Sequence, residues 1–200
     1  SFVDKTHGWA AGGLGTILHT SDGGVTWKEQ ETGVHFLMEK VFFIDREHGW
    51  AVGGWPRDYE VAIKGGMGVI LATSNGGKTW ESQLDSAGGW LTGLTFLDID
   101  NGWAVGEFGT IWRTEDGGDN WRQTRKVPTP AWLYDVHFID KQRGWTVGRF
   151  ETVMSTEDGG KSWSKQPMPP LRRPYGLSLN YRAVRFAKPS KGWIVGQHGI

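Results

Sequence analysis

One motif, repeated five times, constrains the fold of this chain more than any other feature. Each copy contains a phenylalanine that lies seven residues before the tryptophan of a Gly-Trp pair. The five pairs of aromatic residues are Phe2/Trp9, Phe43/Trp50, Phe96/Trp103, Phe138/Trp145 and Phe186/Trp193. Copies that recur about every 40 to 50 residues indicate a repeat architecture, in which each copy is one unit of supersecondary structure.

Each copy predicts four short β-strands. A copy reads, in order, V-x-F-x-D, G-W-x-V-G, G-T-I-x-x-T and D-G-G-x-T-W. Apolar and polar residues alternate within these segments and no segment shows helical periodicity, a pattern typical of strands joined by tight turns. Examples of the four expected strands are Val136 to Ile139, Gly49 to Gly53, Gly109 to Thr114, and Trp27 to Gln30. Four antiparallel strands per repeat predict an all-β protein, a β-propeller with four-stranded blades.

The repeat also predicts the domain organisation. We expect a single propeller domain over residues 1–200, with blades that start near residues 2, 43, 96, 138 and 186. Four blades would be complete, whereas the fifth lacks the Asp-Gly-Gly segment. Because half a blade leaves an unpaired strand edge, which closed propellers avoid, we expect this chain to be part of a longer propeller.

The Asp-Gly-Gly segment has a structural and a functional interpretation. As a hairpin turn, its Asp or Asn oxygen would accept N–H groups two residues on, its glycines would permit positive φ, and the preceding Ser or Thr would add a hydrogen bond. As a calcium site, it would offer one carboxylate to an ion that takes about 6–8 oxygens. We therefore favour the structural interpretation, with the following Trp packed between sheets. The residues concerned are Asp22, Asn75, Asp116 and Asp158 with Trp27, Trp80, Trp121 and Trp163.

Two further repeated positions also have a structural interpretation. We expect the tryptophans of the five Gly-Trp pairs to form core layers, because exposing so many large apolar rings would be unfavourable. A second acid recurs after the strand-forming phenylalanine of the first four copies, and we interpret it as a turn residue. Its copies are Asp4, Asp45, Asp98 and Asp140.

Composition excludes several functional classes. The 22 basic and 22 acidic residues balance, which argues against nucleic acid as a partner. The chain has no cysteine, so thiol catalysis and disulfides are excluded, and its six histidines show no zinc spacing. No phosphate-binding or dinucleotide motif is present, and no apolar run approaches the roughly 18 residues of a membrane span. We expect no cofactor and no metal.

The segments SDGGVTW, SNGGKTW, EDGGDNW and EDGGKSW resemble the Asp-box, or BNR repeat, of sialidases, xyloglucan-cleaving glycosidases and sortilin-type receptors. Their coupling to GWAVG and GTI is similar to the photosystem II stability and assembly factor family and its bacterial relatives. This resemblance implies a seven-bladed propeller that is exported to the periplasm or thylakoid lumen. It also implies that the protein binds other proteins, subunits of a membrane complex among them, rather than catalysing a reaction.

Residues outside the repeat predict where function lies. In an up-and-down blade, the second-to-third strand turns and the connections between blades share one face, and function tends to lie on loops held by a rigid scaffold. We call this the loop face. Arginine and aromatic residues, which are enriched at protein–protein hot spots, gather there. The candidate partner-binding residues are Trp55, Arg57, Tyr59, Trp90, Trp132, Arg149, Arg172, Arg173, Tyr175 and Arg182. The alternative to partner binding is that the arginines only face solvent and that the tryptophans only pack at the rim of the propeller.

Two other functional classes stay open at this point. A glycoside hydrolase needs two carboxylates across a cleft. The candidates on the loop face are Asp58, Glu60, Glu107 and Glu151. The F/Y-R-I-P segment of sialidases is missing from the sequence, which argues against that family. A carbohydrate-binding propeller without catalysis would instead use Trp55, Trp90 or Trp132 as stacking platforms.

Overall fold

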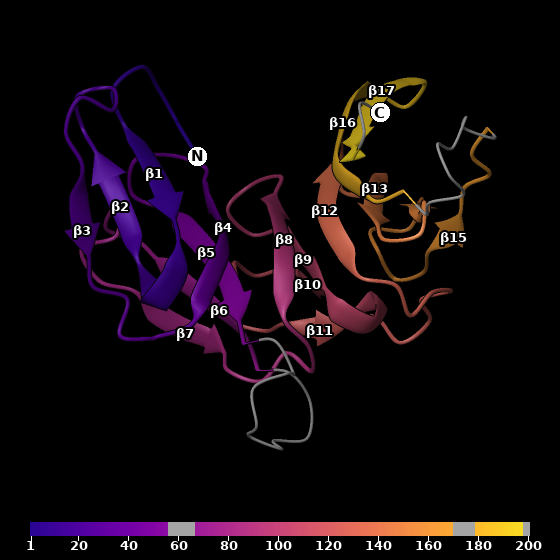
Figure 1. Ribbon diagram of the computed structural model, residues 1–200, viewed down its shortest axis with the longest axis horizontal. Coiled ribbons are helices and arrows are strands. Elements are labelled where there is room, and N and C mark those ends of the chain that lie inside the picture. Colours follow the sequence, from indigo (N-terminus) through magenta and orange to yellow (C-terminus); the bar gives the residue numbers. More distant parts are fainter. Residues whose placement is uncertain (56–66, 170–178, 198–200) are drawn as a thin grey trace.

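The computed structural model describes residues 1–55, 67–169 and 179–197, and these residues form five antiparallel sheets (Figure 1). The first sheet contains β1 (Gly8–Ala11), β2 (Ile17–Thr20) and β3 (Lys28–Gln30). The second contains β4 (Leu37–Phe43), β5 (Gly49–Gly54), β6 (Gly68–Thr73) and β7 (Glu81–Leu84). The third contains β8 (Leu91–Phe96), β9 (Gly102–Gly106), β10 (Ile111–Thr114) and β11 (Arg122–Gln123). The fourth contains β12 (Leu133–Phe138), β13 (Gly144–Gly148), β14 (Val153–Thr156) and β15 (Ser164–Lys165), and the fifth contains β16 (Tyr181–Lys188) and β17 (Lys191–Gly196).

The sheets are simple meanders, which confirms the predicted class of fold. In every sheet each strand pairs with the next one along the chain. The sheets follow one another along an arc, with the first and the fifth at its two ends (Figure 1). Successive first strands contact each other, β1 with β4, β4 with β8, β8 with β12 and β12 with β16. This arrangement is that of blades in a β-propeller, with the first strand of each blade innermost.

Two details differ from the sequence prediction. The first sheet has three strands rather than four, because Phe2 makes only a single bridge, to Gly8. The fourth strand of each blade begins one residue after the tryptophan that we expected to start it, so that Lys28 rather than Trp27 is the first residue of β3.

The Gly-Trp pair joins neighbouring sheets through aromatic stacking. Its glycine lies under the phenylalanine of its own sheet, and a Cβ atom at Gly49 would come within 2.5 Å of the Phe43 ring. Its tryptophan stacks on the phenylalanine of the next sheet, with 3.6 Å between the ring centroids of Trp50 and Phe96. The other stacked pairs are Trp9 with Phe43, Trp103 with Phe138 and Trp145 with Phe186. Both residues of the motif therefore serve one inter-sheet contact.

The same tryptophans hydrogen-bond to the Asp-Gly-Gly turn of the next sheet. Trp103 Nε1 donates to the carbonyl of Gly159 over 2.9 Å, and Trp50 Nε1 donates to that of Gly117 over 3.1 Å. The N–H of Gly159 donates to the carbonyl of Gln142, in the first turn of its own sheet. One glycine thus connects its sheet to the previous one and fixes a second turn.

Inside the Asp-Gly-Gly turn, side chains satisfy the backbone. The Thr20 hydroxyl donates to Asp22 over 2.8 Å and accepts the N–H of Gly24 over 2.9 Å. The Asp22 carboxylate accepts the N–H of Thr26, four residues on, and its hydroxyl. In all four turns the backbone hydrogen bond to this side chain comes from four residues on, and the expected contact with the N–H two residues on occurs in addition at Asp116. The hydroxyl donor also lies two residues before the aspartate rather than directly before it.

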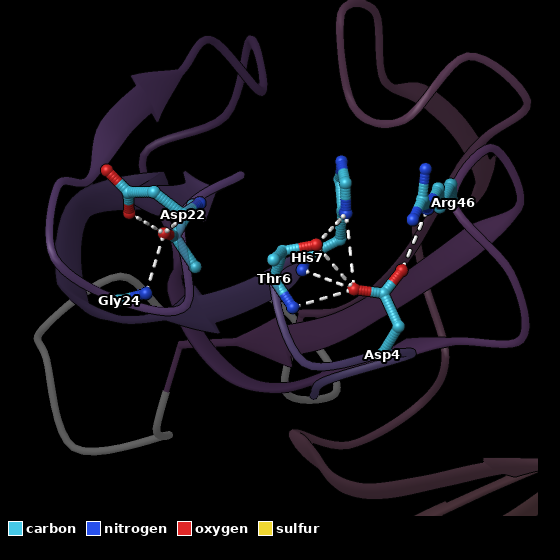
Figure 2. Close-up of polar contacts among 7 residues, drawn as sticks. Asp4, Thr6, His7, Asp22, Gly24 and Arg46 are labelled. Atoms are coloured by element: carbon cyan, nitrogen blue, oxygen red, sulfur yellow. Dashed lines mark hydrogen bonds and ion pairs between the residues drawn. The ribbon is translucent and has the colours of Figure 1, made fainter.

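Acceptance two residues on is regular at the other repeated acid. Asp4 Oδ1 accepts the N–H groups of Thr6 and His7, and Arg46 of the second sheet donates to its Oδ2 over 2.8 Å (Figure 2). These backbone donors, together with the guanidinium, hold the pKa of Asp4 well below its usual range. The equivalent residues Asp45, Asp98 and Asp140 accept the N–H groups two and three residues on in the same way.

Two tryptophans expected in packed positions are exposed. Trp193 is 55% exposed, although it occupies the repeat position of the buried Trp103. Among the described residues no sheet follows β17, so no phenylalanine stacks on the Trp193 ring. Trp27 is also exposed, and its contacts are an edge-on approach to Phe2 and a hydrogen bond to the Gly24 carbonyl.

A first prediction concerns the inter-sheet stack. Replacing Trp103 by Ala removes a buried ring, and we expect the free energy of unfolding to fall by about 3–5 kcal/mol. Trp103→Phe keeps a ring against Phe138 but loses the bond to the Gly159 carbonyl, which costs about 1 kcal/mol. The exposed Trp193 is the matched control, and Trp193→Ala should cost less than about 1 kcal/mol. Urea unfolding followed by circular dichroism measures all three, and equal losses at positions 103 and 193 would contradict the stacking account.

A second prediction concerns pH. Hydrogen bonds from Thr26 and Asn120 respectively lower the pKa values of Asp22 and Asp116 from 3.8 to about 2. A lowered folded-state pKa stabilises the fold above the unfolded value, and this contribution is lost as pH falls. The free energy of unfolding should therefore decrease between about pH 4 and pH 2.

A natural control for this prediction exists in the second sheet. Asn75 forms the same turn without a charge, and its amide donates to the Thr79 hydroxyl. Asp22→Asn can make the same bond to Thr26. Urea unfolding across the acid range should show a shallower pH dependence for this variant, with little change at pH 7. A pH profile parallel to that of the wild type would show that Asp22 does not contribute.

Candidate aromatic and arginine docking site

Five side chains form a continuous cluster on the loop face. The rings of Trp90 and Trp132 meet edge to face, with 5.6 Å between their centroids, and Trp132 meets Tyr134 in the same way at 6.3 Å. The guanidinium of Arg149 lies 4.2 Å from the centre of the Trp132 ring, and that of Arg182 lies 4.1 Å from the centre of the Tyr134 ring. Arg149 Nε also donates to the Tyr134 hydroxyl over 2.9 Å. The cluster thus spans three successive sheets.

Backbone hydrogen bonds position the two tryptophans directly before the first strands of their sheets. The carbonyl of Trp132 accepts the N–H of Arg149 over 2.8 Å, and the carbonyl of Trp90 accepts the N–H of Glu107 over 2.9 Å. The Glu107 carboxylate accepts the N–H of Trp90 in return. Because each tryptophan is fixed at its backbone to the turn beside it, the cluster is rigid before any partner arrives.

A β-bulge recurs in the first strand of four sheets and orients the inner part of the cluster. The ladder with the second strand skips one residue in β4, β8, β12 and β16. The skipped residues are Glu39, Thr92, Tyr134 and Arg182. A bulge turns a side chain out of the regular alternation and is common next to functional sites. Two members of the cluster, Tyr134 and Arg182, therefore occupy the same bulged position in neighbouring sheets.

A buried carboxylate lies next to the bulge. The side chain of Asp135 is 2% exposed, and it accepts hydrogen bonds from the N–H of Val184 at 3.0 Å and from Arg185 at 2.5 Å. Lys40 of the second sheet reaches the same carboxylate at 3.4 Å. Asp135 therefore ties β4, β12 and β16 together beneath the cluster.

A glycine lets the intervening strand come close. Gly93 in β8 occupies the repeat position of Asp135, and a Cβ atom there would lie 2.9 Å from the Tyr134 carbonyl. Since real Cβ atoms do not approach carbonyl oxygens so closely, only glycine allows β8 and β12 to pack at this separation. The position of Tyr134 thus depends on a residue with no side chain in the neighbouring sheet.

The two arginines of the cluster have hydrogen-bonding capacity to spare. Stacking on an aromatic ring uses the face of a guanidinium and leaves the N–H groups at its edge able to donate. Among the residues that the structure describes, neither Arg149 nor Arg182 has a carboxylate within ion-pair distance. Burial raises the pKa of the Glu39 carboxyl, and the charge of Arg182 lowers it by a smaller amount. The cluster therefore combines apolar rings with cationic donors outside ion pairs, which suits carbonyl and carboxylate acceptors.

The structure brings together only some of the residues selected from sequence. Trp90, Trp132, Arg149 and Arg182 lie in the cluster, whereas Trp55 packs edge-on against Phe36. The remaining candidates lie outside the described residues, and they are Arg57, Tyr59, Arg172, Arg173 and Tyr175.

Sequence reasoning missed two residues of this region. Tyr134 lies two residues after Trp132, a spacing that places two side chains on the same side of a strand and could have identified it. Asp135 stands in a segment of otherwise apolar inward positions, Y-D-V-H-F, and a charge there is a signal for a buried ion pair.

The carboxylates considered for glycoside hydrolysis do not belong to this cluster. Glu107 is 2% exposed and its carboxylate holds the N–H of Trp90, so it is a structural residue rather than one that faces a cleft. Asp58 and Glu60 lie outside the described residues. In the described part of the chain, no group of His, Asp and Glu side chains is arranged to hold a metal ion, and no helix is long and apolar enough to cross a bilayer.

A third prediction tests the buried carboxylate. Asp135→Asn keeps an acceptor for the N–H of Val184 but removes the charge that faces Arg185 and Lys40, so we expect unfolding to become easier by about 1–3 kcal/mol. The control is the exposed carboxylate of Glu115, which pairs with the partly buried Arg113, and Glu115→Gln should change stability by less than about 1 kcal/mol. Thermal and urea unfolding measure both variants. A neutral Asp135→Asn substitution would show that the inter-sheet charge contact does not stabilise the fold.

Comparisons with known proteins bear on the fold. Residues 119–200 match the model of the family described as photosynthesis system II assembly factor YCF48. Among curated proteins no sequence matches the chain.

Several solved structures are similar. YCF48 from Cyanidioschyzon merolae is 18% identical, with a TM-score of 0.50 over 100% of this chain and 92% of that one. A structure of YCF48 bound to a D1 peptide is also 18% identical, with a TM-score of 0.50 over 99% of this chain and 89% of that one.

A glycosidase has the same fold. The GH74 xyloglucanase from Xanthomonas campestris is 14% identical, with a TM-score of 0.67 over 90% of this chain and 30% of that one. At these identities the structural matches establish the fold alone, whereas the family match applies to residues 119–200. The chain is a BNR-type β-propeller, and its residues 119–200 are similar to the photosystem II assembly factor YCF48.

Proposed function

We propose that this propeller is a non-catalytic scaffold that docks a protein segment on its loop face, and that the cluster of Trp90, Trp132, Tyr134, Arg149 and Arg182 is the contact. The observation that carries this proposal is the stacking of two arginines, neither of them in an ion pair among the described residues, on a row of aromatic rings. Aromatic residues and arginine supply most hot spots of protein interfaces. Rings held by backbone bonds lose little conformational entropy when a partner binds.

The partner chemistry follows from the cluster. Tryptophan and tyrosine rings offer apolar contact area to side chains of an extended segment, while the guanidinium edges can donate to its backbone carbonyls or to a carboxylate. The structure of a related YCF48 with a D1 peptide supports a peptide as the class of ligand. We propose that the partners of this chain include subunits of a membrane complex and that the protein acts outside the cytoplasm.

Catalysis of glycoside cleavage is the competing function, and the similarity to GH74 xyloglucanases motivates it. The burial of Glu107 removes one of its candidate carboxylates. Carbohydrate binding without catalysis would use the same tryptophans, so the two docking hypotheses differ in their dependence on arginine. Sugars stack on the rings, whereas a peptide also engages the guanidinium groups.

A fourth prediction tests docking with the D1 peptide as the probe. Tryptophan fluorescence should change when this peptide is titrated into the protein, because Trp90 and Trp132 lie in the contact. Trp132→Ala and Arg182→Gln should each weaken the affinity by about tenfold or more, the usual effect at a hot spot. Arg122 in the outer strand β11 is exposed, and Arg122→Gln serves as the control with unchanged affinity.

The other outcomes separate the alternatives. Binding of the peptide that is indifferent to both Trp132→Ala and Arg182→Gln would remove the cluster from the proposal. Saturable binding of xyloglucan oligosaccharides that depends on Trp132 but not on Arg182 would favour the carbohydrate-binding function. Hydrolysis of these oligosaccharides would favour the enzyme.

A further inference from the structure

Every sheet of the first four presents one large apolar side chain at the same place on the loop face. The position is the second residue after the G-W-x-V-G segment or its equivalent. It is occupied by Leu14, Trp55, Phe108 and Phe150, which are between 40% and 75% exposed. We refer to these four side chains as the apolar tips. The equivalent residue of the fifth sheet, His198, lies outside the described residues.

The backbone at three of the tips has a conformation that large apolar residues disfavour. Leu14, Phe108 and Phe150 each have φ of 55°, in the left-handed region. Leu14 is followed by Gly15 at φ 77°, and the N–H of Thr16 donates to the carbonyl of Gly13. This is a type I′ turn, whose first central position favours Asn, Asp or Gly. The backbone conformation of this turn therefore disfavours the Leu and Phe side chains at its first central position.

Backbone hydrogen bonds flank three of the tips. In the third sheet, the N–H of Glu107 donates to the carbonyl of Trp90 in its own sheet, and the N–H of Gly109 donates to that of Ala131, which leads into the next sheet. The N–H groups of Arg149 and Glu151 bond in the same way on either side of Phe150. Flanking bonds on both sides are thus present at Phe108 and Phe150, whereas at Leu14 only the N–H of the following Gly15 makes one, to the carbonyl of Phe36. These bonds fix the backbone of the turns that carry the tips.

An exposed apolar side chain at four equivalent places, three of them in a disfavoured backbone conformation, calls for a functional explanation. The tips occupy separate turns, one for each sheet along the arc, and do not form one compact patch. Protein hot spots cluster at the centre of an interface, which single residues on separate turns do not. A bilayer interface accepts separate apolar side chains without any matching shape, and tryptophan is enriched there.

Cationic side chains accompany two of the tips. Arg125 lines the same shallow hollow as Phe108, and Arg149 directly precedes Phe150. Membrane association is strengthened when cations lie beside inserted apolar groups and the lipid is anionic. We propose that the loop face is also a membrane-docking surface, on which the apolar tips enter the interface of an anionic lipid bilayer.

The experiment uses vesicles of mixed phosphatidylcholine and phosphatidylglycerol, with pure phosphatidylcholine for comparison. The full chain should co-sediment with the anionic vesicles, and less with the neutral ones. The triple variant Leu14→Asn, Phe108→Asn, Phe150→Asn should bind these vesicles at least about tenfold more weakly. Its melting temperature should stay equal or rise, because Asn is preferred in this turn. A loss of binding caused by unfolding is thereby distinguished from a loss of the tips.

A matched control lies on the opposite face. Val25 and Ile99 are exposed apolar residues in turns on that side, and the double variant Val25→Asn, Ile99→Asn should bind vesicles as the wild type does. Arg182→Gln separates this proposal from peptide docking, since it should weaken peptide binding and leave vesicle binding unchanged. Failure of the wild type to bind anionic vesicles would overturn the proposal, as would undiminished binding by the triple variant. Loss of peptide binding or of self-association in the triple variant, without vesicle binding, would assign the tips to a protein contact instead.

Discussion

The stack of each tryptophan on the phenylalanine of the next sheet is the contact on which the structure depends. Four such stacks, with ring centroids 3.6 or 3.8 Å apart, join the five sheets in order. Each stack requires a glycine before the tryptophan, because the phenylalanine of the same sheet covers that glycine. Each of the first three tryptophans also donates its indole N–H to the Asp-Gly-Gly turn of the next sheet. The Gly-Trp pair and the Asp-Gly-Gly turn, which are separate motifs in the sequence, therefore meet in one contact between sheets.

This contact explains which parts of the structure could be predicted. Strand number, strand order and the structural nature of the Asp-Gly-Gly turn follow from residues that recur in register. The exposure of Trp193 could not be predicted, since burial at this position depends on a neighbouring phenylalanine rather than on the residue itself. The bulge at Tyr134 was equally hidden, because alternation in the sequence does not reveal where a ladder skips a residue.

The inner part of the candidate docking site lies at a β-bulge whose backbone geometry repeats from sheet to sheet while its side chains differ. The bulged position is the same in four successive sheets, where it is occupied by Glu39, Thr92, Tyr134 and Arg182. Asp135 beside it joins three strands from three different sheets, so the distances between these side chains are set by a buried charge rather than by flexible loops. Sequence reasoning found the two tryptophans and the two arginines because they depart from the repeat. It could not show that the rings meet, because their contact depends on the spacing between sheets.

In the docking site, the candidate functional residues are those that differ between copies of the repeat. In the type I′ turns, they are instead residues that recur in several copies. There the repeat itself carries the unusual residues, and a search for departures from it passes over them. The backbone of a two-residue hairpin loop favours small or amide side chains at positive φ, so a Leu or a Phe in three of the four turns opposes the local preference. Their side chains are between 46% and 75% exposed, so packing within the chain covers them only in part. An apolar environment outside the chain would cover the exposed part, because removing apolar surface from water is favourable.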